Sequence, residues 1–140
     1  MADVTISDQE LRVMMESGFV LREAGRLDAA EAVFRGVLEL IPRSEVPLVA
    51  LATIELQRGK IDHAVALAEQ ARRVNPQSLY ARVHHAEALL FGGRRDEAEG
   101  LLGEVIAADP ASPHTQTARR LLEAADLITA ATVNAVTSDK

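Results

Sequence analysis

The residues that could do chemistry in this chain are its four histidines: His63, His84, His85 and His114. Cysteine is absent, which excludes a thiol nucleophile, a disulfide and a thiolate zinc site. Neighbouring residues on a helix point about 100° apart, so His84 and His85 cannot bind one metal ion from that helix alone. We expect His85 to lie on the packing side of its helix. We expect His84 to form a surface pair with Glu87, three residues further on.

The run Gly92-Gly93-Arg94-Arg95 shares only its glycines with a phosphate-binding loop, which would continue into Gly-Lys-Ser or Gly-Lys-Thr. Three arginine pairs are expected to be solvated and to form ion pairs, because the chain has 21 acidic and 15 basic residues: Arg72-Arg73, Arg94-Arg95 and Arg119-Arg120. A net charge of -6 argues against nucleic acid or an anionic membrane as partner. The sequence therefore predicts a protein that is not an enzyme, with no catalytic, cofactor-binding or metal-binding residues.

The element that must position any functional residue is a turn that recurs every 34 residues: Gly25-Arg26-Leu27-Asp28-Ala29-Ala30, Gly59-Lys60-Ile61-Asp62-His63-Ala64 and Gly93-Arg94-Arg95-Asp96-Glu97-Ala98. Glycine permits the positive φ that ends one helix, and the aspartate three residues later is expected to cap the next helix. In two copies a glutamate lies three residues after the aspartate, as in a capping box: Glu31 and Glu99. Prolines and serines recur with the same period, and we expect them to end one helix pair and begin the next: Pro42, Pro76, Pro110, Ser44, Ser78 and Ser112.

These signals predict three helix pairs and a terminal helix. A capping box formed by Ser7 and Glu10 should begin the first helix near Asp8. The predicted divisions are a lead-in at 1–10, units at 11–44, 45–78 and 79–112, a capping helix at 113–127 and an apolar tail at 128–140, in which residues 128–137 carry no charge. The tail either continues the capping helix with frayed ends or packs on a second copy of the chain.

The composition suits one globular domain of closely packed helices, with 48% apolar, 26% charged and only 3% aromatic residues. The first residues, Met1-Ala2-Asp3-Val4-Thr5, show neither a basic nor an apolar leader segment. No apolar run approaches the roughly 20 residues that span a bilayer. We therefore expect no membrane insertion and a cytoplasmic location.

The repeated turn, the 34-residue period and the proline phase resemble the tetratricopeptide repeat family. Three sets of positions fit its pattern: Gly18, Ala52 and Ala86; Ala30, Ala64 and Ala98; Pro42, Pro76 and Pro110. Three sites depart from it: Arg82 at the large-residue position, Glu55 at the tyrosine position, and Ala68 and Leu102 where the first unit has Phe34. The resemblance implies an all-α, right-handed α-solenoid of three helix-turn-helix units plus a C-terminal capping helix.

In this family the first helices of the units line a concave groove. The resemblance places these residues in a protein-binding groove: Met15, Phe19, Val46, Val49, Thr53, Leu56, Tyr80, Val83, Glu87, Leu90 and Phe91. The polar residues Arg12, Arg22, Glu23 and Gln57 occupy equivalent positions. Three of the four aromatic residues fall in this groove set, which predicts an apolar groove for a partner segment, either extended or an amphipathic helix, with hydrophobic anchors. The alternative is that the capping helix or another part of the chain covers these residues.

Members of the family that clamp an acidic C-terminus carry cations or an amide where this chain has Met15, Phe19, Tyr80 and His84, so we expect no such clamp. The run His84-His85-Ala86-Glu87-Ala88-Leu89-Leu90, followed by Gly93 and Ala98, is similar to the third unit of the translocator chaperones of bacterial type III secretion. The small size and three units also resemble that group. This resemblance implies a chaperone or adaptor that holds an export subunit. The alternative is a scaffold that self-assembles through its solenoid ends, and a homodimer is left open.

Overall fold

The computed structural model describes residues 5–138, with side chains described for residues 5–131. Seven helices and no strand form within this range. Their bounds are α1 Asp8–Glu23, α2 Leu27–Leu40, α3 Val46–Gln57, α4 Ile61–Val74, α5 Leu79–Phe91, α6 Arg95–Ala108 and α7 Pro113–Ser138. None of the helices in the described range is both long enough and apolar enough to cross a bilayer.

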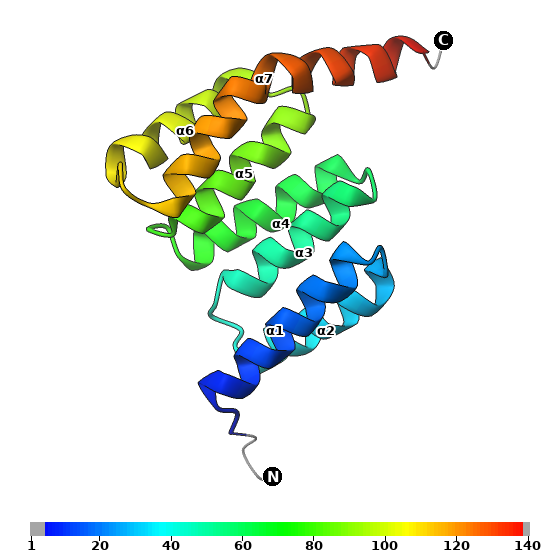
Figure 1. The fold of residues 1–140 in the computed structure, drawn as a ribbon, viewed down its shortest axis with the longest axis vertical. Coiled ribbons are helices and arrows are strands. Elements are labelled where there is room, and N and C mark those ends of the chain that lie inside the picture. Colours follow the sequence, from blue (N-terminus) through cyan, green and yellow to red (C-terminus); the bar gives the residue numbers. More distant parts are fainter. Residues whose placement is uncertain (1–4, 139–140) are drawn as a thin grey trace.

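The helices form three antiparallel pairs that stack along one axis, α1 with α2, α3 with α4 and α5 with α6 (Figure 1). The first helix of each unit packs on the second helix of the unit before it, and α3 also packs on α5. Helix α7 covers α5 and α6 at the end of the stack. The predicted all-α solenoid of three helix-turn-helix units with a C-terminal capping helix is confirmed.

The three repeated glycines end α1, α3 and α5 in the same way. Gly25, Gly59 and Gly93 all have φ of 78°, the left-handed region that glycine adopts without strain. In the first copy the backbone N–H of Arg26 donates to the carbonyl of Leu21 at 2.9 Å, and the N–H of Gly25 donates to that of Arg22 at 3.0 Å. These are the paired bonds of a Schellman motif, which satisfy the last carbonyls of the helix. The predicted role of the glycines is confirmed.

The predicted role of the aspartates as helix caps is wrong. The N-cap residues of α2, α4 and α6 are Arg26, Lys60 and Arg94, and none makes a side-chain capping bond. Asp28, Asp62 and Asp96 lie inside the first turn instead. After the Schellman glycine the next helix starts within two residues, which leaves the aspartate past the cap. It still places a negative charge at the positive end of the helix dipole.

The capping boxes proposed for the repeated turns are also wrong, because their glutamates bond to arginines. Glu31 accepts from Arg35 Nε at 2.7 Å and Glu99 accepts from Arg95 Nε at 2.8 Å. The box at the start of α1 is confirmed: the N–H of Glu10 donates to Ser7 Oγ at 3.1 Å, and the Glu10 carboxylate reaches back to Ser7. Ser78 caps α5 as expected, accepting from the N–H of Ala81 at 3.1 Å.

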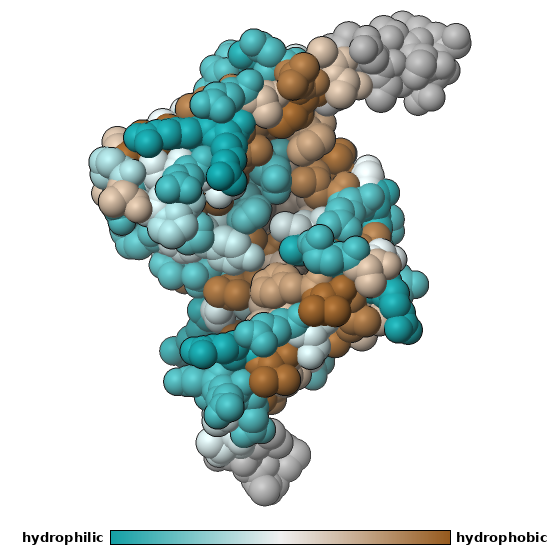
Figure 2. Space-filling model, viewed as in Figure 1, coloured by the Kyte–Doolittle hydropathy of each residue, from teal (hydrophilic) through white to brown (hydrophobic). Residues whose placement is uncertain are grey.

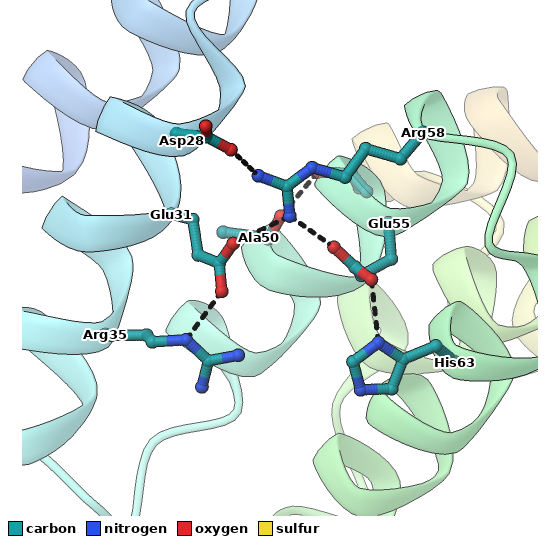
Figure 3. Close-up of polar contacts among 8 residues, drawn as sticks. Asp28, Glu31, Arg35, Ala50, Glu55, Arg58 and His63 are labelled. Atoms are coloured by element: carbon teal, nitrogen blue, oxygen red, sulfur yellow. Dashed lines mark hydrogen bonds and ion pairs between the residues drawn. The ribbon is translucent and has the colours of Figure 1, made fainter.

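An arginine at the end of α3 joins the first two units (Figure 3). Arg58 Nη1 donates to Glu31 Oε1 and to Glu55 Oε1, both at 2.6 Å, and Nη2 donates to Asp28. The other oxygen of Glu55 lies 2.7 Å from His63 Nδ1 on α4. Burial raises the pKa of Glu55, but the hydrogen bonds with His63 and Arg58 outweigh it and leave that pKa below its ordinary value. The tyrosine position of the family pattern is thus occupied by a buried, paired carboxylate.

Helix α7 is longer than the capping helix predicted at 113–127, since it continues to Ser138. Its first part is fixed to α6: Arg95 Nη1 donates to Asp126 Oδ1 at 2.6 Å, and the buried Thr115 hydroxyl donates to the carbonyl of Asp109. Ile128 still packs against the core of the third unit. Beyond it, the last part of α7 projects past the other helices (Figure 1). The proposed packing of the tail on a second copy stays a prediction, and the side chains after residue 131 lie outside the described residues.

Packing is close between α1 and α2, where the ring of Phe34 fills the space above Gly18. A Cβ atom on Gly18 would lie 2.4 Å from Phe34 Cε1. Gly100 on α6 is exposed, and a Cβ there would meet nothing within 4 Å. Both glycines therefore lie inside a helix, but only Gly18 has a neighbouring side chain that an added methyl group would displace.

We predict that Gly18→Ala lowers the free energy of unfolding by about 1 to 3 kcal/mol, because the added methyl group displaces the Phe34 ring. Gly100→Ala should instead raise the free energy of unfolding by about 0.5 to 1 kcal/mol through helix propensity. Urea denaturation followed by circular dichroism measures both. Equal effects of the two substitutions would contradict the packing described for Gly18.

Candidate functional site

A cleft of about 380 Å³ lies where the first helices of the three units meet. We call it the central cleft, and its lining residues are Arg22 from α1, Thr53, Leu56 and Gln57 from α3, and His84, Glu87 and Phe91 from α5. The first helices of the units therefore share one face of the solenoid. In the space-filling view, apolar patches over α1, α3 and α7 are separated by hydrophilic side chains (Figure 2).

The predicted groove residues divide into three groups in the structure. Thr53, Leu56, Glu87 and Phe91 line the central cleft. Val49, Val83 and Leu90 do not lie on the surface, because all three are fully buried. Their side chains are used in packing between helices, since α3 packs on α5 and α5 packs on α7. The expectation that these three residues face solvent in the groove is corrected accordingly.

The third group, Met15, Phe19, Val46 and Tyr80, is half-buried. The ring of Phe19 lies 5.3 Å from that of Phe34, measured between centroids. Tyr80 meets His84 edge-on at 4.9 Å, and its ring centroid lies 5.6 Å from that of His114 on the capping helix. Burial raises the pKa of the Tyr80 hydroxyl. Other parts of the chain thus cover much of Phe19 and Tyr80, which were expected to lie open in the groove. For Tyr80 this agrees with the alternative that the capping helix covers groove residues.

Phe91 is the aromatic residue that remains most open, with 38% of its surface exposed. It lies at the last position of α5, just before the Gly92-Gly93 turn, where no further turn of helix can cover it. Leu56 lines the same cleft from α3. These two side chains form the apolar part of the central cleft.

The α1 wall of the cleft carries a cation. Arg22 Nη1 donates to Thr53 Oγ1 at 2.8 Å, and Nη2 lies 3.3 Å from Glu23 Oε1. Its guanidinium carbon lies 5.0 Å from the centre of the Phe19 ring, a cation–π contact. The Nε atom is buried and has no hydrogen-bond partner. This guanidinium is held in place but only partly bonded.

The α5 wall carries the pair predicted from the sequence. His84 Nδ1 lies 3.2 Å from Glu87 Oε1, which confirms that pair. The sequence assigned His84 only to a surface pair, yet His84, Glu87 and Phe91 follow each other at i, i+3 and i+7 and therefore share one helix face. That spacing could have placed His84 in the cleft. The lining of the central cleft includes five polar residues among seven, although its exposed surface is more apolar than polar.

His85 lies on a different face of α5 and is buried, as predicted. It lines a second hollow of about 390 Å³ with Glu69, Arg72, Arg73 and Pro76. Burial, and next the charge of Arg72, lower its pKa to about 4, and Arg72 Nη1 lies 3.1 Å from its Nδ1. Among the described side chains, no three histidines or carboxylates gather as a metal-binding group.

Comparison with known proteins adds one sequence family and a set of similar folds. A family profile described as tetratricopeptide repeat matches residues 21–83 and 55–122. A search of curated protein sequences finds no match.

Solved structures with similar folds include the type III secretion translocator chaperone SycD of Yersinia enterocolitica, with a TM-score of 0.72 and 24% identity over 85% of this chain and 92% of that one. PcrH from Pseudomonas aeruginosa has a TM-score of 0.70 and 22% identity, covering 92% of this chain and 96% of that one. PcrH in complex with the chaperone binding region of PopB has a TM-score of 0.69 and 22% identity, covering 88% of this chain and 97% of that one. The TM-scores establish a shared fold, and at identities below 25% the likeness shows the fold alone.

We predict that His85 makes stability depend on pH between about 6.5 and 4. The pKa of His85 is lower in the folded chain, so below pH 6.5 the unfolded chain binds more protons than the folded chain. The free energy of unfolding therefore decreases as the pH is lowered from about 6.5 to about 4. One such group contributes a slope of at most about 1.4 kcal/mol per pH unit. Urea denaturation at a series of pH values should show a shallower slope for His85→Gln than for the wild type. NMR titration should find the His85 ring neutral down to about pH 4, and titration near 6.5 would contradict its burial.

Proposed function

The chain belongs to the tetratricopeptide repeat family, and from that premise we propose that it is a non-enzymatic module that holds a segment of a partner protein in the central cleft. The observation that carries this proposal is the exposure of Phe91 beside Leu56, in a chain with only four aromatic residues. An exposed aromatic residue at the edge of a cleft is a typical anchor site in protein interfaces. The partner would contribute apolar side chains that cover this pair, from an extended segment or an amphipathic helix.

We further propose that the chain is a cytoplasmic chaperone or adaptor whose partner is an export subunit of a type III secretion system. Two proteins of similar fold support this: PcrH has been solved with the chaperone binding region of PopB, and SycD with a peptide of the translocator YopD. The run from His84 to Leu90, similar to the third unit of such chaperones, contributes both polar residues of the α5 wall.

The test compares Phe91→Ala with a control that also truncates an exposed apolar residue. Val20 on α1 is 68% exposed and lies outside the central cleft, so Val20→Ala is the matched control. Loss of an anchoring ring costs about 1 to 3 kcal/mol, which corresponds to roughly a five- to 150-fold loss of affinity. We expect the immobilised wild type and Val20→Ala to retain the same proteins from a lysate of the source organism, and Phe91→Ala to lose them. Quantitative mass spectrometry measures the difference.

Retention of the same proteins by Phe91→Ala would contradict the central cleft as the site. If the proteins lost with Phe91→Ala include no secretion subunit, the result would support a general adaptor in place of the secretion role. Phe19 is unsuitable for this test, because its ring packs on Phe34 and its truncation would also weaken the contact between α1 and α2.

A second candidate function is a scaffold that assembles through the ends of the solenoid. Exposed apolar residues at both ends favour it: Val13 and Val20 on α1, and Leu127, 75% exposed, on α7. The projecting part of α7 would provide additional surface. A contact between opposite ends of two chains could repeat and form open assemblies.

If the chain is a scaffold, deletion of residues 132–140 should reduce its mass in solution from that of an oligomer to that of a monomer, slightly below the 15.1 kDa of the full chain. This deletion leaves Ile128 in place, which packs on the core, so the solenoid should remain folded. Sedimentation velocity measures the mass, and circular dichroism checks the fold. A monomeric wild type, or an oligomer that survives the deletion, would count against assembly through the tail.

A further inference from the structure

Building on the proposed function, we propose that the segment bound in the central cleft carries an aspartate or glutamate next to an apolar residue, and that Arg22 binds its carboxylate. Arg22 would then determine specificity, while Leu56 and Phe91 receive the apolar side chain. The partner would be recognised by a pair of neighbouring side chains of different chemistry.

The first observation is that Arg22 is largely buried without a strong ionic partner. Its side chain is 18% exposed, and the carboxylate within ion-pair distance among the described residues belongs to Glu23, at 3.3 Å and 74% exposed. An ion pair with so exposed a partner contributes little. A buried charge without good pairing is costly, so a carboxylate delivered to Arg22 would be stabilised more than one bound at the surface.

Other arginines of the chain show what full pairing looks like. Arg58 contacts carboxylates of α2 and α3 within 2.6 Å, Arg94 contacts Glu97 at 2.8 Å, and Arg95 contacts Glu99 at 2.8 Å and Asp126 at 2.6 Å. Arg22 differs from these, because the carboxylate it contacts lies farther away, at 3.3 Å from Nη2, and its Nε is buried without a hydrogen-bond partner. The buried hydrogen-bond donor of the cleft that lacks a partner therefore belongs to Arg22.

The second observation is that the guanidinium is already oriented. Thr53 Oγ1 accepts from Nη1, while the Thr53 hydroxyl itself donates to the carbonyl of Ala50 at 2.7 Å, so its lone pairs point to Arg22. The Phe19 ring lies against the guanidinium at 5.0 Å. An arginine fixed in this way loses less conformational entropy when it binds a carboxylate than a free surface arginine does.

The third observation concerns the opposite wall. Glu87 is the carboxylate of the cleft lining, and its Oε1 already has His84 Nδ1 at 3.2 Å. A lysine or arginine in the partner would compete with His84 and would also bring a like charge into the cleft beside Arg22. An acidic residue would bring a like charge near Glu87, but Glu87 already pairs with His84, whereas among the described residues Arg22 has only the exposed Glu23. Charge complementarity therefore favours an acidic residue over a basic one.

The experiment selects twelve-residue peptides from a random phage-displayed library on the wild type, Arg22→Gln and Phe91→Ala. We expect wild-type peptides to be enriched in aspartate or glutamate within three positions of an apolar residue. Peptides selected on Arg22→Gln should keep the apolar enrichment and lose the acidic one. A synthetic peptide from the wild-type selection should lose about ten- to a hundredfold in affinity when its acid is replaced by the corresponding amide, and this loss should vanish on Arg22→Gln.

The replacement of the acid in the peptide tests the proposal on the wild type alone, so a folding defect in Arg22→Gln cannot obscure the result. If the selected peptides depend on Phe91 but show no acidic preference, or prefer lysine or arginine, the role of Arg22 is overturned while the proposed function stands. If no peptide depends on Phe91, both are overturned. Arg22→Lys keeps the positive charge but loses the planar guanidinium that can donate two parallel hydrogen bonds, so it should retain a weaker preference for acidic peptides.

Discussion

The bond network of Arg58 is the interaction on which the relation between the first two units depends. This residue ends α3, yet it reaches Asp28 and Glu31 on α2, and through Glu55 it is linked to His63 on α4 (Figure 3). In a repeat protein each unit contacts only its neighbours, so the angle between units is set locally. Arg22 on α1 and Thr53 on α3 meet at 2.8 Å across this same junction. The geometry of the central cleft therefore relies on charges that lie outside it.

Much of the fold could be predicted because its signals are local and repeated. A glycine that needs a positive φ, at three positions 34 residues apart, is enough to place the turns. The Ser7–Glu10 box and the burial of His85 follow from contacts within one helix or from the side of a helix that a residue occupies. The aspartates after the glycines do not cap the helices as predicted, because the cap position depends on how tightly the Schellman turn closes. Spacing in the sequence does not report that geometry.

The candidate site was harder to predict, because it depends on which surfaces the helices use to pack on one another. The family resemblance places Val49, Val83 and Leu90 in a groove, but the contacts of α3 with α5 and of α5 with α7 bury them. Their burial leaves polar neighbours such as Arg22 and Gln57 to form the wall of the cleft. A pattern of residue types gives the face of a helix, whereas the distance between two helices comes from the packing of both.

The length of α7 has a consequence for how the protein can be handled. At a rise of 1.5 Å per residue, the helix beyond Ile128, the last described residue that packs on the core, extends about 15 Å. A fluorophore or affinity tag attached at the C-terminal end would be separated by this spacer from α1, α3 and the cleft between them (Figure 1). The carboxyl end is therefore the natural side for immobilising the chain on a sensor surface, with the opposite pole of the solenoid left free.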